Sequence, residues 1–414
     1  MSTVRKTKLS FLAVAAFALI ASLALVNCGG GGGGGSSTTT PNPTYTVTYD
    51  GNGNTSGSVP TDSATYETGK TVTVKDNTGN LVKTGYSFTN WNSRADGSGT
   101  TYGASFTMGT ANVTLYAKWT AKWTGTKQLG AAGKPTDGES VVVDKSGNVY
   151  VAGWTQGGLD GNTLAGRQDF MLAKYDSVGS KVYVKQTGVA GKDAMAFDVA
   201  VDGSGNVYVA GLTEGGLDGN TLTGRRDYFL TKYDSSGTKL YSKQTGSVGT
   251  YTDAMGVAVD GSGNVYVAGS TTGGLDGNAL AGTNDYFLTK YDSSGNRSYT
   301  KQTGAAGKAT IANCVAVDAN GNVYVAGQTT GGLDGHLLTG VQGYFLIKYD
   351  SAGNKLYTKQ VGTGGTFVVA EGVAVDGSGN VYVTGQTNSG MDGNAVTGTG
   401  DYFVTKYDST GNKQ

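Results

Sequence analysis

The sequence predicts an all-β protein in which a five-bladed β-propeller follows a small β-rich module. Glycine accounts for 71 of the 414 residues and tyrosine for 25, a composition that favours short strands and tight turns over helices. From residue 121 to 414 the sequence repeats every 58 residues without insertions, and such a period is typical of propellers and solenoids. Each repeat holds four strand-like segments, which is the content of one propeller blade.

Residues 1–27 are predicted to be a lipoprotein signal peptide. Basic residues near the start precede an apolar run over residues 9–26 that only two serines interrupt. The string Leu25-Val26-Asn27-Cys28 resembles the cleavage box of bacterial lipoproteins, which implies that Cys28 is lipidated and becomes the first mature residue. An uncleaved membrane anchor is the alternative. Both predict an extracytoplasmic protein of the bacterial cell envelope, lipid-anchored in the first case at the outer membrane or cell surface.

Residues 28–43 are predicted to be a flexible tether. Seven consecutive glycines at 29–35 are followed by serines and threonines, which is the composition of a flexible linker. With Cys28 lipidated, Cys314 has no disulfide partner, so the fold must be stabilised by packing. Cys314 lies in an apolar strand-like run and is expected to be a small buried side chain.

Residues 44–120 are predicted to form a small β-module, with strands at 45–49, 71–74, 86–91 and 113–119. The order of its motifs resembles the internalin-type B repeat of bacterial surface proteins. The motifs that carry this resemblance are Tyr45-Thr46-Val47-Thr48-Tyr49-Asp50, Val59-Pro60, Gly85-Tyr86-Ser87-Phe88-Thr89-Asn90-Trp91 and Leu115-Tyr116-Ala117-Lys118-Trp119. The resemblance implies a β-grasp-like spacer or adhesive unit. Phe88, Trp91 and Trp119 are expected in its core.

Residues 121–414 are predicted to form the propeller. The string Asn-Val-Tyr-Val begins at Asn148, Asn206, Asn264, Asn322 and Asn380. One repeat has strand candidates at 255–259, 264–268, 286–291 and 298–302, joined by Gly-Asn and Asp-Gly turns. The repeated Lys-Tyr-Asp at residues 290–292 is read as structural, with tyrosine between blades and lysine extending to solvent. The elements at 258–269 and 285–292 resemble the bacterial SBBP β-propeller repeat family, which implies a propeller over nearly 300 residues.

The ends of the chain predict how the ring closes. The last repeat ends at Lys413-Gln414, before its fourth strand is complete, whereas Lys127-Gln128 aligns with Lys185-Gln186 of the fourth strand one repeat later. The segment at 121–130 is therefore expected to complete the last blade. This would close the ring at five blades and leave no open sheet edge.

Connectivity places the loops of each blade on two opposite sides. The tight turns at 260–263 and 292–296 lie on one side, and the long loop at 270–284 and the link at 303–310 lie on the other. The long loops differ most between copies, and variable loops on a rigid scaffold are where proteins bind ligands. The candidate ligand-binding residues on this side are Trp154, Arg167, Arg225 and Arg226.

Each long loop carries Gly-Gly-Leu-Asp-Gly or a close variant. The aspartates are Asp160, Asp218, Asp276, Asp334 and Asp392. A closed ring would place their carboxylates at one height, where a calcium site is conceivable, although Asp before Gly is also ordinary turn chemistry. No cofactor is predicted, and calcium is left open.

Charge and composition exclude several functions. Lys and Arg number 31, as do Asp and Glu, which disfavours nucleic-acid binding. The single histidine, His336, disfavours His-dependent triads. The favoured function is a membrane-anchored binding or adhesion protein without catalysis, with a monomeric head and an unknown protein or glycan partner at the cell surface. The alternatives are an extracellular carbohydrate-active enzyme with its site on the long-loop rim, and a structural envelope protein.

Overall fold

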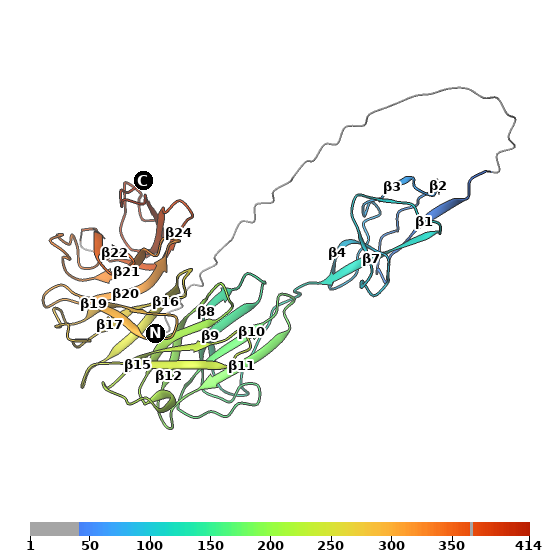
Figure 1. Cartoon of the computed structure of the whole chain (residues 1–414). Helices are drawn as coiled ribbons and strands as arrows, with labels where there is room; N and C mark the ends of the chain where they lie inside the picture. Colours follow the sequence, from blue (N-terminus) through green and yellow to red (C-terminus); the bar gives the residue numbers. More distant parts are fainter. Residues whose placement is uncertain (1–40, 365–366) are drawn as a thin grey trace. The chain divides into compact units, whose positions relative to one another are not determined.

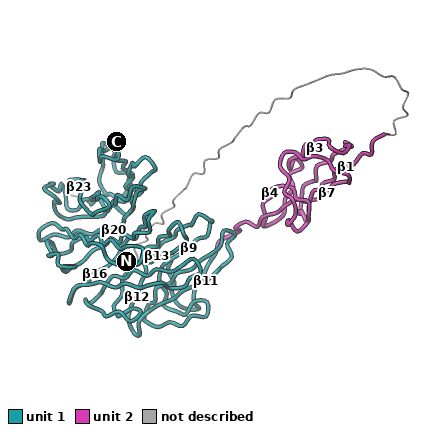
Figure 2. The backbone as a smooth tube through the Cα atoms, in the orientation of Figure 1, with its two compact units in different colours: residues 1–10, 127–414 teal, residues 11–126 magenta. Residues whose placement is uncertain are grey.

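The computed structural model describes residues 41–364 and 367–414. The predicted signal peptide, Cys28 and nearly all of the tether lie outside these residues. No helix within the described ranges is long and apolar enough to cross a membrane. The described chain divides between Thr126 and Lys127 into two compact units, which Figure 2 colours separately.

The first unit is a mixed β-module. Its strands are β1 (Thr44–Asp50), β2 (Thr65–Glu67), β3 (Thr71–Thr73), β4 (Tyr86–Asn92), β5 (Thr101–Tyr102), β6 (Ser105–Thr107) and β7 (Val113–Ala121). Five of them form one sheet in the order β2-β1-β7-β4-β5. The parallel pairing of β1 with β7 brings the two ends of the module together.

An aromatic cluster fills the core of this module, as the sequence predicts. Trp91 is buried, and the Phe88 and Tyr49 rings meet it edge-on with centroids 5.2 and 4.7 Å away. Trp119 is half-buried beside Phe88. The Trp91 indole N–H donates to the Lys75 carbonyl at 2.9 Å, so the polar end of the largest buried ring is satisfied.

The second unit consists of five antiparallel sheets, one for each 58-residue repeat, called sheets 1–5 from here on (Figure 1). Sheets 1–4 have four strands and sheet 5 has three. The strands are, in sheet 1, β8 (Thr136–Val143), β9 (Val149–Thr155), β10 (Asp169–Tyr175) and β11 (Lys181–Thr187); in sheet 2, β12 (Ala194–Val201), β13 (Val207–Thr213), β14 (Asp227–Tyr233) and β15 (Lys239–Thr245); in sheet 3, β16 (Thr252–Val259), β17 (Val265–Thr271), β18 (Asp285–Tyr291) and β19 (Arg297–Thr303); in sheet 4, β20 (Thr310–Val317), β21 (Val323–Thr329), β22 (Gly343–Tyr349) and β23 (Lys355–Val361); in sheet 5, β24 (Val368–Val375), β25 (Val381–Thr387) and β26 (Asp401–Tyr407). One short 3-10 turn, η1 (Leu217–Gly219), lies in the long loop of sheet 2.

The turn between the first two strands of each sheet is built around an aspartate. The Asp260 carboxylate accepts hydrogen bonds from the Ser262 and Asn264 N–H groups, the Asn264 amide and the Tyr266 hydroxyl, at 2.8–3.0 Å. Burial alone would raise the pKa of Asp260, but these donors outweigh it and hold the pKa below its usual value. The same contacts recur at Asp144, Asp202, Asp318 and Asp376. These are hairpin turns, as the sequence predicts.

Neighbouring sheets pack face to face through their third strands. All seven residues of β10, β14 and β22 are buried, which requires that both faces of these strands be covered. Tyr228 of sheet 2 stacks on Phe287 of sheet 3 with ring centroids 4.9 Å apart, and its hydroxyl is 2.7 Å from the Tyr291 hydroxyl. The same hydroxyl pair joins Tyr286 to Tyr349 and Tyr344 to Tyr407.

The repeated lysine of the third strand is also buried between sheets. Lys232 donates to the Ser293 carbonyl of the next sheet at 2.9 Å and lies over the Tyr208 ring. The expectation that this lysine extends to solvent is therefore wrong. The physical reason is that the neighbouring turn offers a carbonyl and two tyrosine faces, which together satisfy the ammonium where it is.

Sheet 5 differs from the others because it lacks a fourth strand within the described residues. β26 pairs with β25, and beyond that only a single bridge joins Tyr407 to Lys413. The segment at 122–130 is not paired with β26 in this structure. Closure of the ring by this segment therefore stays a prediction.

One hydroxyl pair is missing at the boundary between sheets 1 and 2. The residue equivalent to Tyr228 is Phe170, which stacks on Phe229 but has no hydroxyl. The Tyr233 hydroxyl, on a side chain only 2 % exposed, consequently makes no hydrogen bond, and the Thr187 side chain that faces it does not reach hydrogen-bonding geometry.

We predict that Phe170→Tyr stabilises the protein, because the added hydroxyl would pair with Tyr233 as Tyr228 pairs with Tyr291. The expected gain is about 1 kcal/mol in the free energy of unfolding, or roughly 2 °C in Tm, measured by thermal and urea denaturation. Tyr228→Phe is the matched control and should destabilise by a similar amount. A lower Tm for Phe170→Tyr would contradict the assignment.

Candidate functional site

Arg167 links sheets 1 and 2 on the long-loop side. Its guanidinium makes a two-pronged contact with the Asp193 carboxylate at 2.8 and 3.1 Å and reaches the Glu214 carboxylate at 2.5 Å. Both acidic residues belong to sheet 2 or its entry link, so this ion pair crosses the boundary. The Arg167 side chain is 60 % exposed, so solvent screens much of the attraction. The ion pair of Arg167 therefore adds little to the stability of the fold, and its side chain is mainly part of the exposed surface.

Arg226 makes the corresponding link between sheets 2 and 3, with different partners. Its guanidinium is 2.7 and 2.8 Å from the two carboxylate oxygens of Asp253, and it lies 5.2 Å from the centre of the Tyr251 ring. This pair is more buried than the Arg167 pair, which makes Arg226 a structural link.

Arg225 directly precedes Arg226 in the chain, but its side chain is exposed. Its guanidinium lies 6.0 Å from the centre of the exposed Tyr251 ring, and within the described ranges no carboxylate pairs with it. The backbone of Arg225 is held by an N–H bond to the Thr250 carbonyl at 2.7 Å. Its backbone is therefore held in place, and a ligand can reach its exposed side chain.

Trp154 lies at the long-loop end of β9. Its indole N–H donates to the Glu139 carboxylate of β8 at 3.1 Å, and the ring is half-buried. The predicted residues Trp154, Arg167, Arg225 and Arg226 thus occur on one side of sheets 1–3, together with Tyr251 and acidic side chains. This group is called the long-loop surface below.

Sequence reasoning missed the partners of these arginines. Asp193, Glu214 and Asp253 lie 26–47 positions from their arginines and meet them only because consecutive sheets pack together. The sequence did contain a signal for Asp193, because its position varies between repeats. Later repeats carry Tyr251, Ala309 and Phe367 there.

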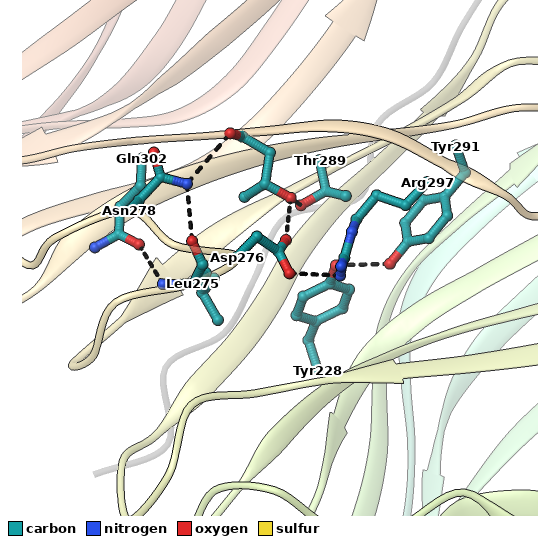
Figure 3. A network of polar contacts seen from close by, with 9 residues as sticks. Tyr228, Leu275, Asp276, Asn278, Thr289, Tyr291, Arg297 and Gln302 are labelled. Atoms are coloured by element: carbon teal, nitrogen blue, oxygen red, sulfur yellow. Dashed lines mark hydrogen bonds and ion pairs between the residues drawn. The ribbon is translucent and has the colours of Figure 1, made fainter.

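Most of each long loop is fixed against its own sheet and is not a free rim. In sheet 3, the buried Leu275 donates its N–H to the Gln302 side chain at 2.8 Å, and the Asn278 amide donates to the Leu275 carbonyl at 2.8 Å (Figure 3). The last residues before the third strand, where Arg167 and Arg225 occur, are exposed. This part of the loop is available to a partner.

The five loop aspartates are each held within their own sheet. Every one has a positive φ of 51–53°, the left-handed conformation that Asp tolerates in turns. Figure 3 shows Asp276, which pairs with the Arg297 guanidinium at 2.7 Å and accepts from the Thr300 hydroxyl. In the other sheets Asp160, Asp218, Asp334 and Asp392 pair with Lys181, Lys239, Lys355 and Lys413.

Each of these carboxylates thus has a cation of its own sheet as partner. In sheet 4, burial opposes ionisation of Asp334, but hydrogen bonds from Lys355 and Thr358 outweigh it and lower the pKa of this aspartate. The structure contains, within the described ranges, no group of three or more His, Cys, Asp or Glu residues arranged to hold a metal ion. The five aspartates are therefore not brought together as a calcium site. His336 is exposed in the same loop of sheet 4.

The chain matches two family models. A Listeria-Bacteroides repeat domain covers residues 45–118. An SBBP β-propeller repeat matches five times, at 125–160, 182–218, 240–276, 298–334 and 356–390. The chain contains five SBBP β-propeller repeats. Both family resemblances noted in the sequence are thereby confirmed, and the first unit corresponds to the Listeria-Bacteroides repeat domain.

Two relatives match different shares of the chain. The regulatory protein FlaEY of Caulobacter vibrioides is 27 % identical over 264 residues, which cover 59 % of this chain and 26 % of FlaEY. A protein of Evansella cellulosilytica, whose name describes a Gly-rich membrane protein, is 50 % identical over 76 residues, or 18 % of this chain and 8 % of that protein. The chain thus spans about a quarter or less of the length of these relatives.

Solved structures with a similar fold include enzymes. A PL25 ulvan lyase matches with 14 % identity and a TM-score of 0.38 over 72 % of this chain and 74 % of that one. The gluconolactonase XC5397 from Xanthomonas campestris matches with 11 % identity and a TM-score of 0.34 over 64 % and 70 %. The expectation that the chain is not an enzyme is corrected on this ground, because propellers of this kind include enzymes. Likeness at this level assigns no activity to the chain.

Proposed function

We propose that this SBBP-repeat protein is a membrane-anchored, extracytoplasmic binding protein whose propeller recognises a protein or glycan at the cell surface. The observation that supports it is the long-loop surface. Its arginines and Trp154 belong to sheets 1 and 2, and Tyr251 lies in the link to sheet 3. The position of Arg167 and Arg225 carries Thr283, Val341 and Thr399 in sheets 3–5. Arg, Trp and Tyr are the residues that most often dominate binding energy.

The asymmetry of this surface is the argument for binding. The framework residues of the repeat, such as the turn aspartates and the boundary tyrosines, recur from sheet to sheet. Side chains that differ between copies are those that packing does not dictate. An exposed cation, Arg225, next to an exposed aromatic ring, Tyr251, offers both charge and apolar contact to a partner.

We predict that a variant combining Trp154→Ala, Arg167→Ala and Arg225→Ala loses binding to cell-surface glycans and proteins at least tenfold, as removal of interface anchors does. Binding is measured on a glycan array and a surface-protein panel, with calcium and with chelator. The matched control is Ser204→Ala with Ser262→Ala in the opposite turns. Equal loss in both variants would reject this surface. Shortened glycan products in the same incubations would show catalysis.

Anchoring is proposed to occur through Cys28. The supporting features are the basic start, the apolar run and the cleavage-box resemblance in the sequence, followed by the glycine-rich tether. The name of the Evansella relative agrees with a membrane location. The tether would allow the binding unit to extend away from the membrane.

We predict that Cys28→Ala abolishes incorporation of labelled fatty acid and moves the protein from the membrane to the soluble fraction. Ser36→Ala, in the tether, is the control and should leave both unchanged. Membrane association that survives the Cys28 substitution would support the uncleaved-anchor alternative.

We further propose that the five sheets close into a ring, with sheet 5 against sheet 1. At each of four boundaries a third-strand lysine donates to a serine carbonyl of the next sheet, as Lys348 does to Ser409 at 2.9 Å. In a closed ring of five sheets, the equivalent contact at the fifth boundary would join Lys406 to Ser177. The equivalent tyrosine pair would join Tyr402 to Tyr175. Residues 125–128 would then supply the fourth strand of sheet 5.

The open face of sheet 5 supports closure. Tyr402 is 77 % and Val404 63 % exposed, whereas their equivalents Tyr344 and Leu346 in sheet 4 are fully buried. Exposed apolar groups next to an unpaired edge strand favour association with a complementary sheet. The face of sheet 1 that is equivalent to the one covering Tyr344 carries Met171, Ala173 and Tyr175. These side chains are buried in a cluster against which Leu129 and Ala131 pack, so closure would exchange part of these contacts for contacts with sheet 5.

We predict that Tyr402→Ser and Val404→Ser each destabilise the propeller, by about 2 kcal/mol, because closure buries these side chains. Urea denaturation measures the change. Val248→Ser, in an exposed link, is the control and should have little effect. If Tyr402→Ser and Val404→Ser unfold like the parent, the ring is open.

A further inference from the structure

A second candidate site lies between sheets 2 and 3, apart from the long-loop surface. It is an open pocket of about 310 Å³ between β15 and the turn that joins β18 to β19. Lys243, Gln244, Tyr291, Asn296 and Arg297 are among its lining residues, and it has no aliphatic side chain in its lining. Amides, hydroxyls and two cations therefore determine what it can bind.

Lys243 is the free cation of this pocket. Within the described residues no carboxylate pairs with it, whereas Arg297 is neutralised by Asp276 at 2.7 Å. Lys243 lies against the Tyr241 ring, 5.6 Å from its centre. It also lies against Gly295, where a Cβ would come within 2.8 Å of the Lys243 Cε. Glycine at this positive-φ position lets the lysine side chain cross the turn.

The same arrangement recurs at the other sheet boundaries. Lys185, Lys301 and Lys359 occupy the position of Lys243, and none of them has a carboxylate partner within the described ranges. Their Cε atoms lie 2.7–2.8 Å from the position of a Cβ at Gly237, Gly353 and Gly411. The second cation recurs as Lys239, Lys355 and Lys413, each neutralised by its loop aspartate. At each boundary one lysine thus has no carboxylate partner. Beside it are a second cation that is paired and a turn aspartate, such as Asp292, that accepts from the amide of its own turn.

We propose that these boundary pockets bind the acidic sugar units of an anionic polysaccharide, one unit at each pocket. The carboxylate of a uronic acid would accept a charge-assisted hydrogen bond from the lysine. Its ring hydroxyls would match the amides and hydroxyls, and the volume is at the lower end of the range for small-molecule sites. An acidic peptide offers the carboxylate but not the ring hydroxyls, so it matches the amides and hydroxyls of the lining less well.

The repetition of this lysine position at four sheet boundaries supports the proposal. A single shallow polar pocket binds weakly, but one such pocket at each of the four equivalent lysines would engage one chain at several points. Multivalent binding of this kind gives the near-identical repeats a shared role in binding. A single asymmetric site would not require such repeats. The proposal does not depend on the long-loop surface, whose residues are different.

Isothermal titration of the full chain, purified in detergent, with tri-galacturonate tests the proposal. Binding is expected at more than one site per chain, with weaker binding at high salt. Lys243→Met should remove one site, and the combined Met variant of Lys185, Lys243, Lys301 and Lys359 should weaken binding by about tenfold or more. Lys243→Arg should keep the site. Lys145→Met, on an exposed turn, is the control and should leave binding unchanged.

Maltotriose and tri-glutamate separate the chemistry of the ligand from charge alone. Neither is expected to bind as tri-galacturonate does. Equal binding of tri-glutamate, an unaffected four-lysine variant, or no saturable binding to the correctly folded parent would each overturn the proposal. Arg225→Ala should leave tri-galacturonate binding intact, so failure of the long-loop surface and failure of the boundary pockets are distinguishable.

Discussion

The structure depends on one constraint, which is that no sheet of the propeller can bury its own apolar faces. The third strand of a repeat is apolar or aromatic on both sides, and all seven residues of β14 are buried. A single sheet exposes one such face to water, so each sheet requires a neighbour. This requirement is met by the stacked rings of Tyr228 and Phe287 and by the buried contact of Lys232 with the next sheet. The same constraint explains why the exposure of Tyr402 and Val404 on sheet 5 is unusual for this repeat.

Much of the fold could be predicted from the sequence because it is periodic. The strands expected at 286–291 and 298–302 are found as β18 and β19, with bounds that differ by one residue. The aspartate turns follow from local hydrogen-bonding chemistry, which the sequence displays directly. The aromatic core of the first unit was predictable for a similar reason, since Phe88 and Trp91 lie on one strand.

The rest depends on contacts between sheets, and spacing along the chain does not reveal those. Arg167 and Arg226 were chosen as surface residues, yet each has a carboxylate partner from the next sheet. The loop aspartates were expected to share one height, whereas each pairs with a lysine or arginine of its own sheet. The lysine of the third strand was expected to extend to solvent, yet Lys232 donates to a carbonyl of the next sheet. For the arginines and for this lysine, the decisive partner comes from a different repeat.

The aspartate-centred hairpins also have a consequence for folding kinetics. All donors to Asp260 lie within six residues, so each hairpin can form before any contact between repeats. Local contacts of this kind speed folding. Near-identical hairpins, however, compete for the same neighbours, and misassembly between repeats is a characteristic failure of repeat proteins. The few positions that differ, such as Phe170 against Tyr228, mean that the sheets are not fully interchangeable, and they give the growing chain a means of distinguishing one neighbour from another.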